Sequence, residues 1–180
     1  MGSMVTGMTT EQADLLSLSD YAWQRLSGRL EGLTDKEYLW EPVAGAWSLR
    51  PDADGVWRAD RVLPPPDPEP VTTIAWRLAH LSDDVLAAER NATWIGLTPE
   101  PSSTPEGKAS TAAEALTRLA EGYAYWRRCL ERATDLDTPM GSIAGPFAKD
   151  SRRAFIFHEL DEFIHHGAEV GVLRDLYRSQ

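Results

Sequence analysis

Apolar residues recur at three- and four-residue steps along four long segments of the chain, and this spacing is typical of one buried face of an α-helix. The four predicted helices span residues 9–32, 72–96, 111–133 and 150–177. Thr9 and Gln12 open the first helix with capping-box spacing, and Thr111 and Glu114 open the third in the same way. No stretch shows sustained alternation of apolar and polar residues, so no strand is predicted.

The helix pattern indicates the fold class. Four amphipathic helices of about twenty residues or more favour an all-α protein built as a four-helix bundle. Because 180 residues suit one domain, we expect residues 9–180 to form a single bundle domain. The start of the chain, MGSMVTGMTT, lacks the basic and apolar regions of a signal peptide, and we expect residues 1–8 to be a tag remnant or a disordered N-terminus.

A segment of about forty residues between the first two helices departs from the helical pattern. A short helix is predicted within residues 35–42, but five prolines between residues 64 and 70 exclude a regular helix further on. Trp40, Trp47 and Trp57 carry too much aromatic surface to be left in water. We therefore interpret this loop as a packed cover over one end of the bundle, with structural padding as an equally weighted alternative.

Composition narrows the classes of partner. The formal charge of −10 argues against nucleic acid, because binding phosphates requires clustered lysine and arginine. No apolar run reaches the length of a membrane-spanning helix. The single cysteine, Cys129, excludes an internal disulfide and fits a reducing cytoplasm. Since no basic motif adjoins Cys129, a buried structural residue is favoured over a catalytic thiol.

Histidine is concentrated near the end of the chain, where FHELDEFIHHGAEV (residues 157–170) holds three of the four histidines. On a helical wheel, one face of this segment carries four polar residues: His158, Glu162, His166 and Glu169. Phe155 and Leu173 share the same angular sector, which favours a face directed into the bundle. Buried carboxylates and imidazoles without partners are costly, and a divalent cation would offset that cost.

The spacing within this face suits a metal site. Glu162 and His166 are four residues apart, so their side chains project side by side and are able to bind one ion. A third ligand has to come from elsewhere, and the remaining histidine is His80 on the second predicted helix. Two alternatives stay open: His80 is a satisfied core histidine, or Asp161 and His165 are the pair that binds the ion.

Three stretches, WEPVAGAWSLRPDADGVW, TTIAWRLAHL and FHELDEFIHHGAEVGVLRDLY, resemble the DinB-like superfamily of metal-dependent four-helix bundles. That superfamily includes mycothiol-dependent maleylpyruvate isomerase and bacillithiol transferases. The resemblance implies His80, Glu162 and His166 as metal ligands. Many members carry three histidines in an H-x-x-x-H-x-x-x-H run, whereas here Glu162 replaces the middle histidine between His158 and His166. Zinc is the metal that this ligand set implies first, and nickel the second.

The resemblance also implies a function. We expect a cytoplasmic, thiol-dependent S-transferase or isomerase that uses mycothiol or a similar low-molecular-weight thiol on a small electrophilic molecule. His158 and Glu169 are expected to orient ligands or transfer protons. A metal-dependent hydrolase and a non-enzymatic metal- or ligand-binding stress-response protein are the alternatives, and a homodimer is implied by the family. Arg77 and Arg174 are interpreted as solvated or paired rather than as contacts to an anionic substrate.

Overall fold

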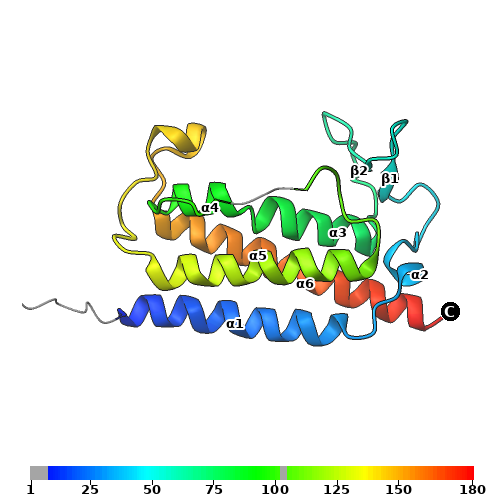
Figure 1. The fold of residues 1–180 in the computed structure, drawn as a ribbon, viewed down its shortest axis with the longest axis horizontal. Coiled ribbons are helices and arrows are strands. Elements are labelled where there is room, and N and C mark those ends of the chain that lie inside the picture. The colour runs from blue at the N-terminus through cyan, green and yellow to red at the C-terminus, as the bar shows by residue number, and fades with distance from the viewer. Residues whose placement is uncertain (1–7, 102–104) are drawn as a thin grey trace, which may run out of the picture.

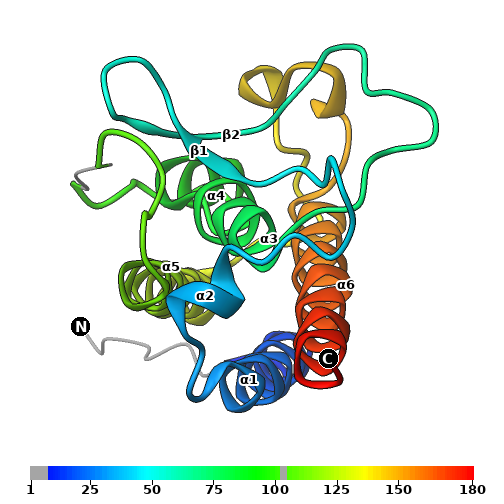
Figure 2. The ribbon, with the colours of Figure 1, turned by 90° about the vertical axis from the view of Figure 1, so that its right-hand side faces the viewer.

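The computed structural model describes residues 8–101 and 105–180, so the predicted tag or disordered segment lies outside the described residues except for Met8. Three long helices, α1 (Thr10–Leu30), α5 (Ala112–Arg132) and α6 (Arg152–Arg178), fill three positions of a bundle. The fourth position is shared by α3 (Ile74–His80) and α4 (Ala88–Trp94). Figure 2 looks along the bundle and shows these four positions. The predicted all-α four-helix bundle is confirmed.

The four positions are not connected in simple up-and-down order. In Figure 1, α1 and α6 run in one direction, whereas α3, α4 and α5 run in the other. Ion pairs support this arrangement, because Arg153 near the start of α6 contacts Glu11 near the start of α1. At the far end of the same two helices, Arg29 contacts Asp175. Since α4 and α5 are parallel, the chain between them has to return along the length of the bundle.

The predicted helix starts are confirmed by side-chain caps. The hydroxyl oxygens of Thr9, Thr111 and Ser151 each accept a hydrogen bond from the backbone N–H three residues later. Gln12 departs from the capping box, because its side-chain amide donates to the carbonyl oxygens of Leu130, Glu131 and Ala133. It thereby adds hydrogen bonds to carbonyl groups at the C-terminus of α5, where the regular backbone hydrogen bonds of the helix end.

The core lies along the axis of the bundle. It contains large apolar side chains that are at most 3% exposed, including Leu26, Leu78, Leu81, Leu119, Leu130, Ile156, Leu160 and Val170. Burial of this apolar surface is the main force that holds the helices together. The sequence predicts an apolar stripe on α1 that consists of Leu15, Leu18, Ala22, Leu26 and Leu30. The structure confirms it except at Leu18, which is 42% exposed.

The second predicted helix is not continuous. After α3, residues Leu81–Val85 form a π-helical segment, η1, in which Leu86 N–H donates to Leu81 C=O over 2.9 Å. The chain then bends at Leu86 and Ala87 before α4 begins. The prediction of one helix over residues 72–96 is therefore wrong in the middle, although both ends remain helical. Single π-turns of this kind occur frequently at functional sites.

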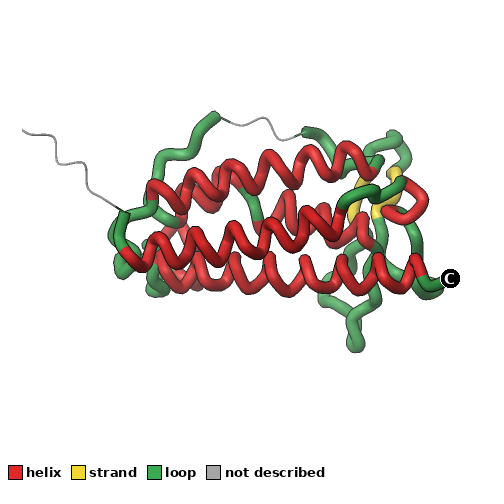
Figure 3. Tube along the Cα trace, turned by 90° about the horizontal axis from the view of Figure 1, so that it is seen from below, coloured by secondary structure: helices red, strands yellow, loops and turns green. Residues whose placement is uncertain are grey.

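The long loop after α1 is ordered. It contains the short helix α2 (Asp35–Tyr38) and an antiparallel hairpin of β1 (Leu49–Pro51) and β2 (Trp57–Ala59). Figure 3 shows the strands at the end of the bundle where the C-terminus lies. The absence of predicted strands is wrong here. The overlooked signal is Asp54–Gly55, a turn dipeptide whose Gly55 has φ of 81°.

The loop packs against the bundle. Trp40, Trp47 and Trp57 are all half-buried, and Trp40 lies edge-on to Tyr177 near the end of α6. Trp47 forms an isolated bridge with Thr72 just before α3, and its ring lies 6.0 Å from that of Trp76. A short 3₁₀ segment, η2 (Ser142–Phe147), precedes α6 at the opposite end. Among the described residues, no helix combines the length and the apolar composition needed to cross a membrane.

Candidate metal centre

Three side chains from two helices meet where α3 packs against α6. His80 is the last residue of α3, directly before the π-helical segment, and Glu162 and His166 lie one turn apart on α6. One ligand atom of each residue lies within 4.8 Å of the ligand atoms of the other two. The structure thus brings together the three residues that the sequence singled out.

The distances among these atoms fit one small ion. Glu162 Oε2 lies 3.5 Å from His80 Nε2 and 3.2 Å from His166 Nε2. Two ligands that each lie about 2.05 Å from a tetrahedral zinc ion are roughly 3.3 Å apart, which is close to both distances. Two imidazole nitrogens and one carboxylate oxygen form a donor set of the kind used in open zinc sites. The residues therefore fit a zinc-type ion in both chemistry and spacing.

The Nδ1 atom of each imidazole lies within hydrogen-bond distance of a carboxylate oxygen. His80 Nδ1 lies 3.0 Å from Asp84 Oδ2, and His166 Nδ1 lies 2.7 Å from Glu169 Oε2. A hydrogen bond from Nδ1–H to a carboxylate assigns the proton to Nδ1 and leaves the lone pair on Nε2. Both Nε2 atoms face Glu162, and each is able to act as a ligand when it carries no proton.

Glu169 has a second partner in Arg77 on α3. Arg77 Nε lies 2.8 Å from Glu169 Oε2, and the Arg77 side chain is 18% exposed. Arg77 Nη1 also lies 3.1 Å from His166 Nδ1, but an Nδ1 that donates its proton to Glu169 does not accept a hydrogen bond from Arg77. Arg77 is thus paired, as predicted, and its positive charge compensates the carboxylate that holds His166.

The charges around the centre favour ionised carboxylates. Partial burial raises the pKa of Glu162, but attraction by His166 and hydrogen bonding to His80 outweigh it, so the pKa lies below its usual range. His158 adds to this attraction. The hydrogen bond from His80 is the main cause that lowers the pKa of Asp84, with Lys108 and Arg61 contributing against its partial desolvation. An ionised carboxylate is the form that binds a metal ion, and a bound ion replaces the protons on the imidazole nitrogens that face Glu162.

Aromatic side chains lie on the loop side of the centre. The Trp76 ring stacks on the His80 ring with a centroid distance of 5.6 Å, and its indole N–H donates to the Asp60 carbonyl in the loop. Trp47 packs against Trp76 from that loop. The tryptophan-bearing loop is therefore in contact with the residue that positions the His80 ring, which supports its interpretation as a packed cover.

The other predicted site residues lie further out. His158 is exposed and lies outside the group of three. His165 is 62% exposed and pairs with Glu169 over 3.3 Å. Within the described residues, the one other group of potential ligands is His165, His166 and Glu169, which does not include Asp161. Arg77 already neutralises Glu169 in that group, so the geometry favours His80, Glu162 and His166.

Several residues of the centre were not predicted. Asp84 lies four residues after His80 and Trp76 four residues before it, so the spacing rule that identified Glu162 and His166 would have found both. Glu159 was also missed, although it is only 4% exposed. Burial raises the pKa of Glu159 to about 7, against the opposing effect of Arg90.

Cys129 and Arg174 behave as predicted. Cys129 is buried, and its burial raises the pKa of the thiol to about 11, which is unsuited to a thiolate nucleophile. Arg174 is 1% exposed and forms a two-point ion pair with Glu37, with distances of 2.7 and 3.0 Å. Neither residue contacts the candidate metal centre.

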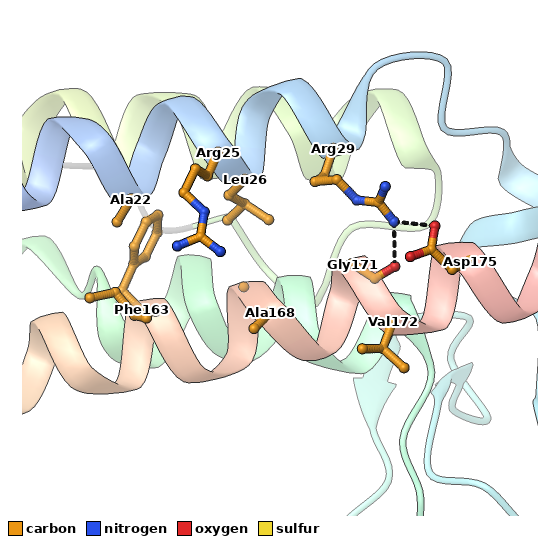
Figure 4. A pocket seen from close by; sticks show the side chains of 11 residues that line it. Ala22, Arg25, Leu26, Arg29, Phe163, Ala168, Gly171, Val172 and Asp175 are labelled. Carbon is orange, nitrogen blue, oxygen red and sulfur yellow. Dashed lines mark hydrogen bonds and ion pairs between the residues drawn. The ribbon is translucent and has the colours of Figure 1, made fainter.

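A groove of about 350 Å³ lies between α1 and α6. Figure 4 shows Arg29 bridging the two helices there through the Gly171 carbonyl and Asp175. Gly167 and Gly171 face Leu26 and Arg29, and their lack of side chains keeps the groove open. The candidate ligands do not line this groove, so the metal centre is separate from it.

Comparisons with known proteins agree with this architecture. A crystal structure described as the conserved protein of locus from Enterococcus faecalis superposes with a TM-score of 0.58 and 15% sequence identity. The match covers 97% of this chain and 100% of that one, and it is evidence for the fold alone. Curated proteins yield no match. The family model of the DinB superfamily matches residues 19–170, which is most of the chain, so the protein belongs to the DinB superfamily.

Proposed function

We propose that this protein binds a divalent metal ion through His80, Glu162 and His166 and catalyses a thiol-dependent S-transfer or isomerisation of a small electrophilic molecule. The observation that carries the proposal is the meeting of three donor atoms within 4.8 Å, with the Nδ1 atom of each imidazole held by a carboxylate. A site prepared in this way is more than a surface ion pair, because the orientation of both rings is fixed before any ligand binds.

The donor set favours zinc, with nickel as the second choice, because imidazole nitrogen and carboxylate oxygen suit both ions. When bound, such an ion acts as a Lewis acid that lowers the pKa of a water molecule or thiol and so generates a nucleophile near neutral pH. A low-molecular-weight thiol such as mycothiol, which the family resemblance implies, is the nucleophile in this proposal.

The residues around the ligands have separate roles. Glu169 is placed to accept a hydrogen bond from Nδ1 of His166, and Arg77 compensates its charge, which favours the tautomer with the proton on the ring nitrogen that faces away from Glu162. Asp84 does the same for His80. The ligand side chains remain 12–30% exposed, which leaves an approach for a small substrate from solvent.

His158 lies at the exposed edge, one turn before Glu162 on α6. Imidazole is the side chain that most often transfers protons in catalysis, and the exposed position of His158 suits this role toward a substrate at this edge. Trp76 and the packed loop bound the opposite side, where they limit the access of water to His80. The electrophile is thus expected to enter between His158 and this aromatic wall.

Elemental analysis tests the ligand assignment. Metal content is measured for the parent protein and for His80→Ala, Glu162→Gln and His166→Ala after equilibration with zinc and removal of free ion. We expect one zinc per chain in the parent and little in the three variants. His165→Ala is the matched control, because His165 is an exposed neighbour on the same helix. Stoichiometric zinc in all three ligand variants, or its loss only in His165→Ala, would overturn the assignment.

A thiol-transfer assay tests the reaction. The zinc-loaded protein is incubated with mycothiol and a bimane halide as the model electrophile, and formation of the thioether is followed by fluorescence. We expect turnover that requires both the metal and the thiol and that is lost in His166→Ala. Metal-dependent turnover of an ester without thiol would instead support a hydrolase, and metal binding without any turnover would support a binding protein.

The homodimer implied by the family resemblance stays a prediction. Light scattering coupled to size-exclusion chromatography measures the mass of the protein in solution, where the monomer mass is 20.0 kDa. We expect twice that mass, and a mass equal to the monomer across the micromolar range would contradict it.

A further inference from the structure

A polar cluster with a half-buried arginine at its centre lies one turn along α6 from the metal centre. It consists of Glu159 on α6 and Arg90 and Asn91 on α4. Glu159 is 4% exposed and Asn91 is 1% exposed. Arg90 Nη2 lies 2.8 Å from Glu159 Oε2, and Arg90 also donates through Nε and Nη2 to Asn91 Oδ1 over 2.9 and 2.7 Å. The cluster is thus a connected hydrogen-bond network across the two helices.

The network ends on one backbone carbonyl. Val85 C=O accepts from Asn91 Nδ2 over 2.8 Å and from Arg90 Nη2 over 3.1 Å. Val85 is the last residue of the π-helical segment η1, after which the chain bends toward α4. Buried carbonyl groups at a helix end are costly unless they are hydrogen-bonded. The two side chains therefore stabilise the irregular end of η1.

The same segment is connected to the metal centre through two residues. His80 directly precedes η1, and Asp84, which holds the His80 ring, lies within it. On the other side, Glu159 lies three residues before Glu162 on α6. The path from Val85 through Arg90 to Glu159 thus ties the segment bearing His80 and Asp84 to the helix bearing Glu162 and His166. The Arg90 guanidinium packs 5.5 Å from the Trp94 and Phe155 ring centres, which fixes its position further.

We infer that Glu159, Arg90 and Asn91 are positioning residues for the metal centre, which set the location of η1 relative to α6 and thereby the spacing between His80 and the Glu162–His166 pair. This inference rests on the proposed metal site. Outer residues that orient metal ligands typically change metal affinity about 10- to 100-fold when they are altered. Glu159 and its partners act through His80 and do not contact the ion themselves.

A second ion pair on α6, which also contains a buried glutamate, provides the control. Glu37 and Arg174 also link α6 to another part of the chain, and the Glu37 and Glu159 side chains are both 4% exposed. Arg174 lies eight residues beyond His166, and its other hydrogen bonds go to the Arg29 and Glu31 carbonyls near the end of α1. Loss of this pair disturbs the anchoring of α6 without touching η1.

The experiment compares Glu159→Gln with Glu37→Gln. Zinc and cobalt affinities are measured by competition with a chelator, the visible absorption of the cobalt form reports ligand geometry, and urea unfolding of the metal-free proteins reports stability. We expect Glu159→Gln to weaken metal binding about 10-fold or more and to alter the cobalt spectrum. Glu37→Gln is expected to lower stability but to retain the affinity and the spectrum of the parent.

Asn91→Ala is a second variant. It removes the hydrogen bond from Asn91 to the Val85 carbonyl, whereas Glu159→Gln alters the contact with Arg90, so the inference stays testable should Glu159→Gln fail to fold. It is expected to change the affinity and the spectrum in the same direction. Parent-like metal affinity and cobalt spectra in the folded variants would overturn the inference, as would equal losses in Glu37→Gln. If metal binding follows the expected pattern but the parent transfers no thiol, the proposed function fails and the positioning role stands. If the parent binds no metal, both fail.

Discussion

Helix α5 and the α3–η1–α4 segment occupy neighbouring positions in the bundle and run in the same direction, and each spans 21 residues. Both carry an apolar stripe, and both begin with a threonine cap, Thr111 in α5 and Thr73 in the second segment. Yet α5 is a regular helix throughout, whereas the second segment contains a π-turn and a bend. Sequence patterns that are equally helical have thus produced two different backbones.

The difference in backbone regularity coincides with the position of the candidate metal ligands. The α5 side chains pack into the core or face solvent, and the candidate ligands lie elsewhere. The interrupted segment carries His80 and Asp84 at the interruption itself. An irregular backbone is less stable than a regular helix, and here the Arg90 and Asn91 side chains compensate by bonding the Val85 carbonyl. Departures from local regularity that need such side-chain support are expected at functional sites.

The largest expected effect comes from removing core leucines in both segments. Leu119 in α5 and Leu81 in η1 are both fully buried. Either Leu→Ala change is expected to lower the free energy of unfolding by about 2–5 kcal/mol, because it removes apolar contacts and leaves a cavity. Only Leu81→Ala is expected to weaken zinc binding as well, since Leu81 directly follows His80. Urea unfolding and zinc competition measure the two quantities, and equal losses of zinc affinity in both variants would contradict the comparison.

The next effect is a pH dependence of stability that originates at Glu159 on α6, the residue that contacts Arg90 of the interrupted segment. Burial raises the pKa of Glu159, which packs on Arg90, from 4.5 to about 7. A carboxyl group with a higher pKa in the folded state contributes stability below its unfolded pKa and loses it as pH rises through the folded pKa. The free energy of unfolding of the metal-free protein is therefore expected to fall between pH 4.5 and 7, by on the order of 3 kcal/mol.

Glu159→Gln tests this pH dependence, because glutamine does not titrate. Urea unfolding of the metal-free parent and variant at intervals across this range gives the slope of stability against pH. We expect the slope to be much reduced in the variant. An unchanged slope would show that another group is responsible.

A smaller effect is expected from an exposed carboxylate. Asp84→Ala removes the acceptor that holds His80 Nδ1, and we expect it to weaken zinc binding about 10- to 100-fold. Because Asp84 is 59% exposed, stability of the metal-free protein is expected to change by less than about 0.5 kcal/mol. Glu121→Ala on α5 is the matched control at an exposed acidic position, and it is expected to leave both quantities as they are. A parent-like zinc affinity of Asp84→Ala would mean that the His80 ring needs no support.

The regular parts of the fold could be predicted from the sequence. The helix starts follow from Thr9, Thr111 and Ser151, whose local chemistry decides where a helix begins. The interruption after His80 has no such local signal, since the stretch LSDDVLAAERN contains neither glycine nor proline. The Val85 carbonyl at its end is bonded by Arg90 and Asn91 from the next turn, but Arg90 is itself held by Glu159, 69 positions away in the chain. A short-range pattern does not contain this information.

The site itself was predicted in part for a similar reason. Helical spacing places Glu162 and His166 side by side, and the isolated His80 completes the group. The same wheel places His158 on that face, yet His158 is exposed while His166 is half-buried. A helical wheel gives the direction of a side chain but not its height along the axis. Only the position of the end of α3 against α6 decides which turn of that face lies opposite His80.

The smallest expected effect tests how closely the bend after η1 packs against α5. Gly122 lies in the middle of α5, and a Cβ atom at this position would lie 3.2 Å from Leu86 Cβ, at the bend after η1. Gly28 lies in α1 with no atom within 4 Å of such a Cβ. Replacing a helical glycine by alanine ordinarily raises stability by about 1 kcal/mol. We expect this gain for Gly28→Ala but little or none for Gly122→Ala, because the bend leaves too little room. Thermal and urea unfolding measure both, and an equal gain at Gly122 would show that the bend is able to move away from α5.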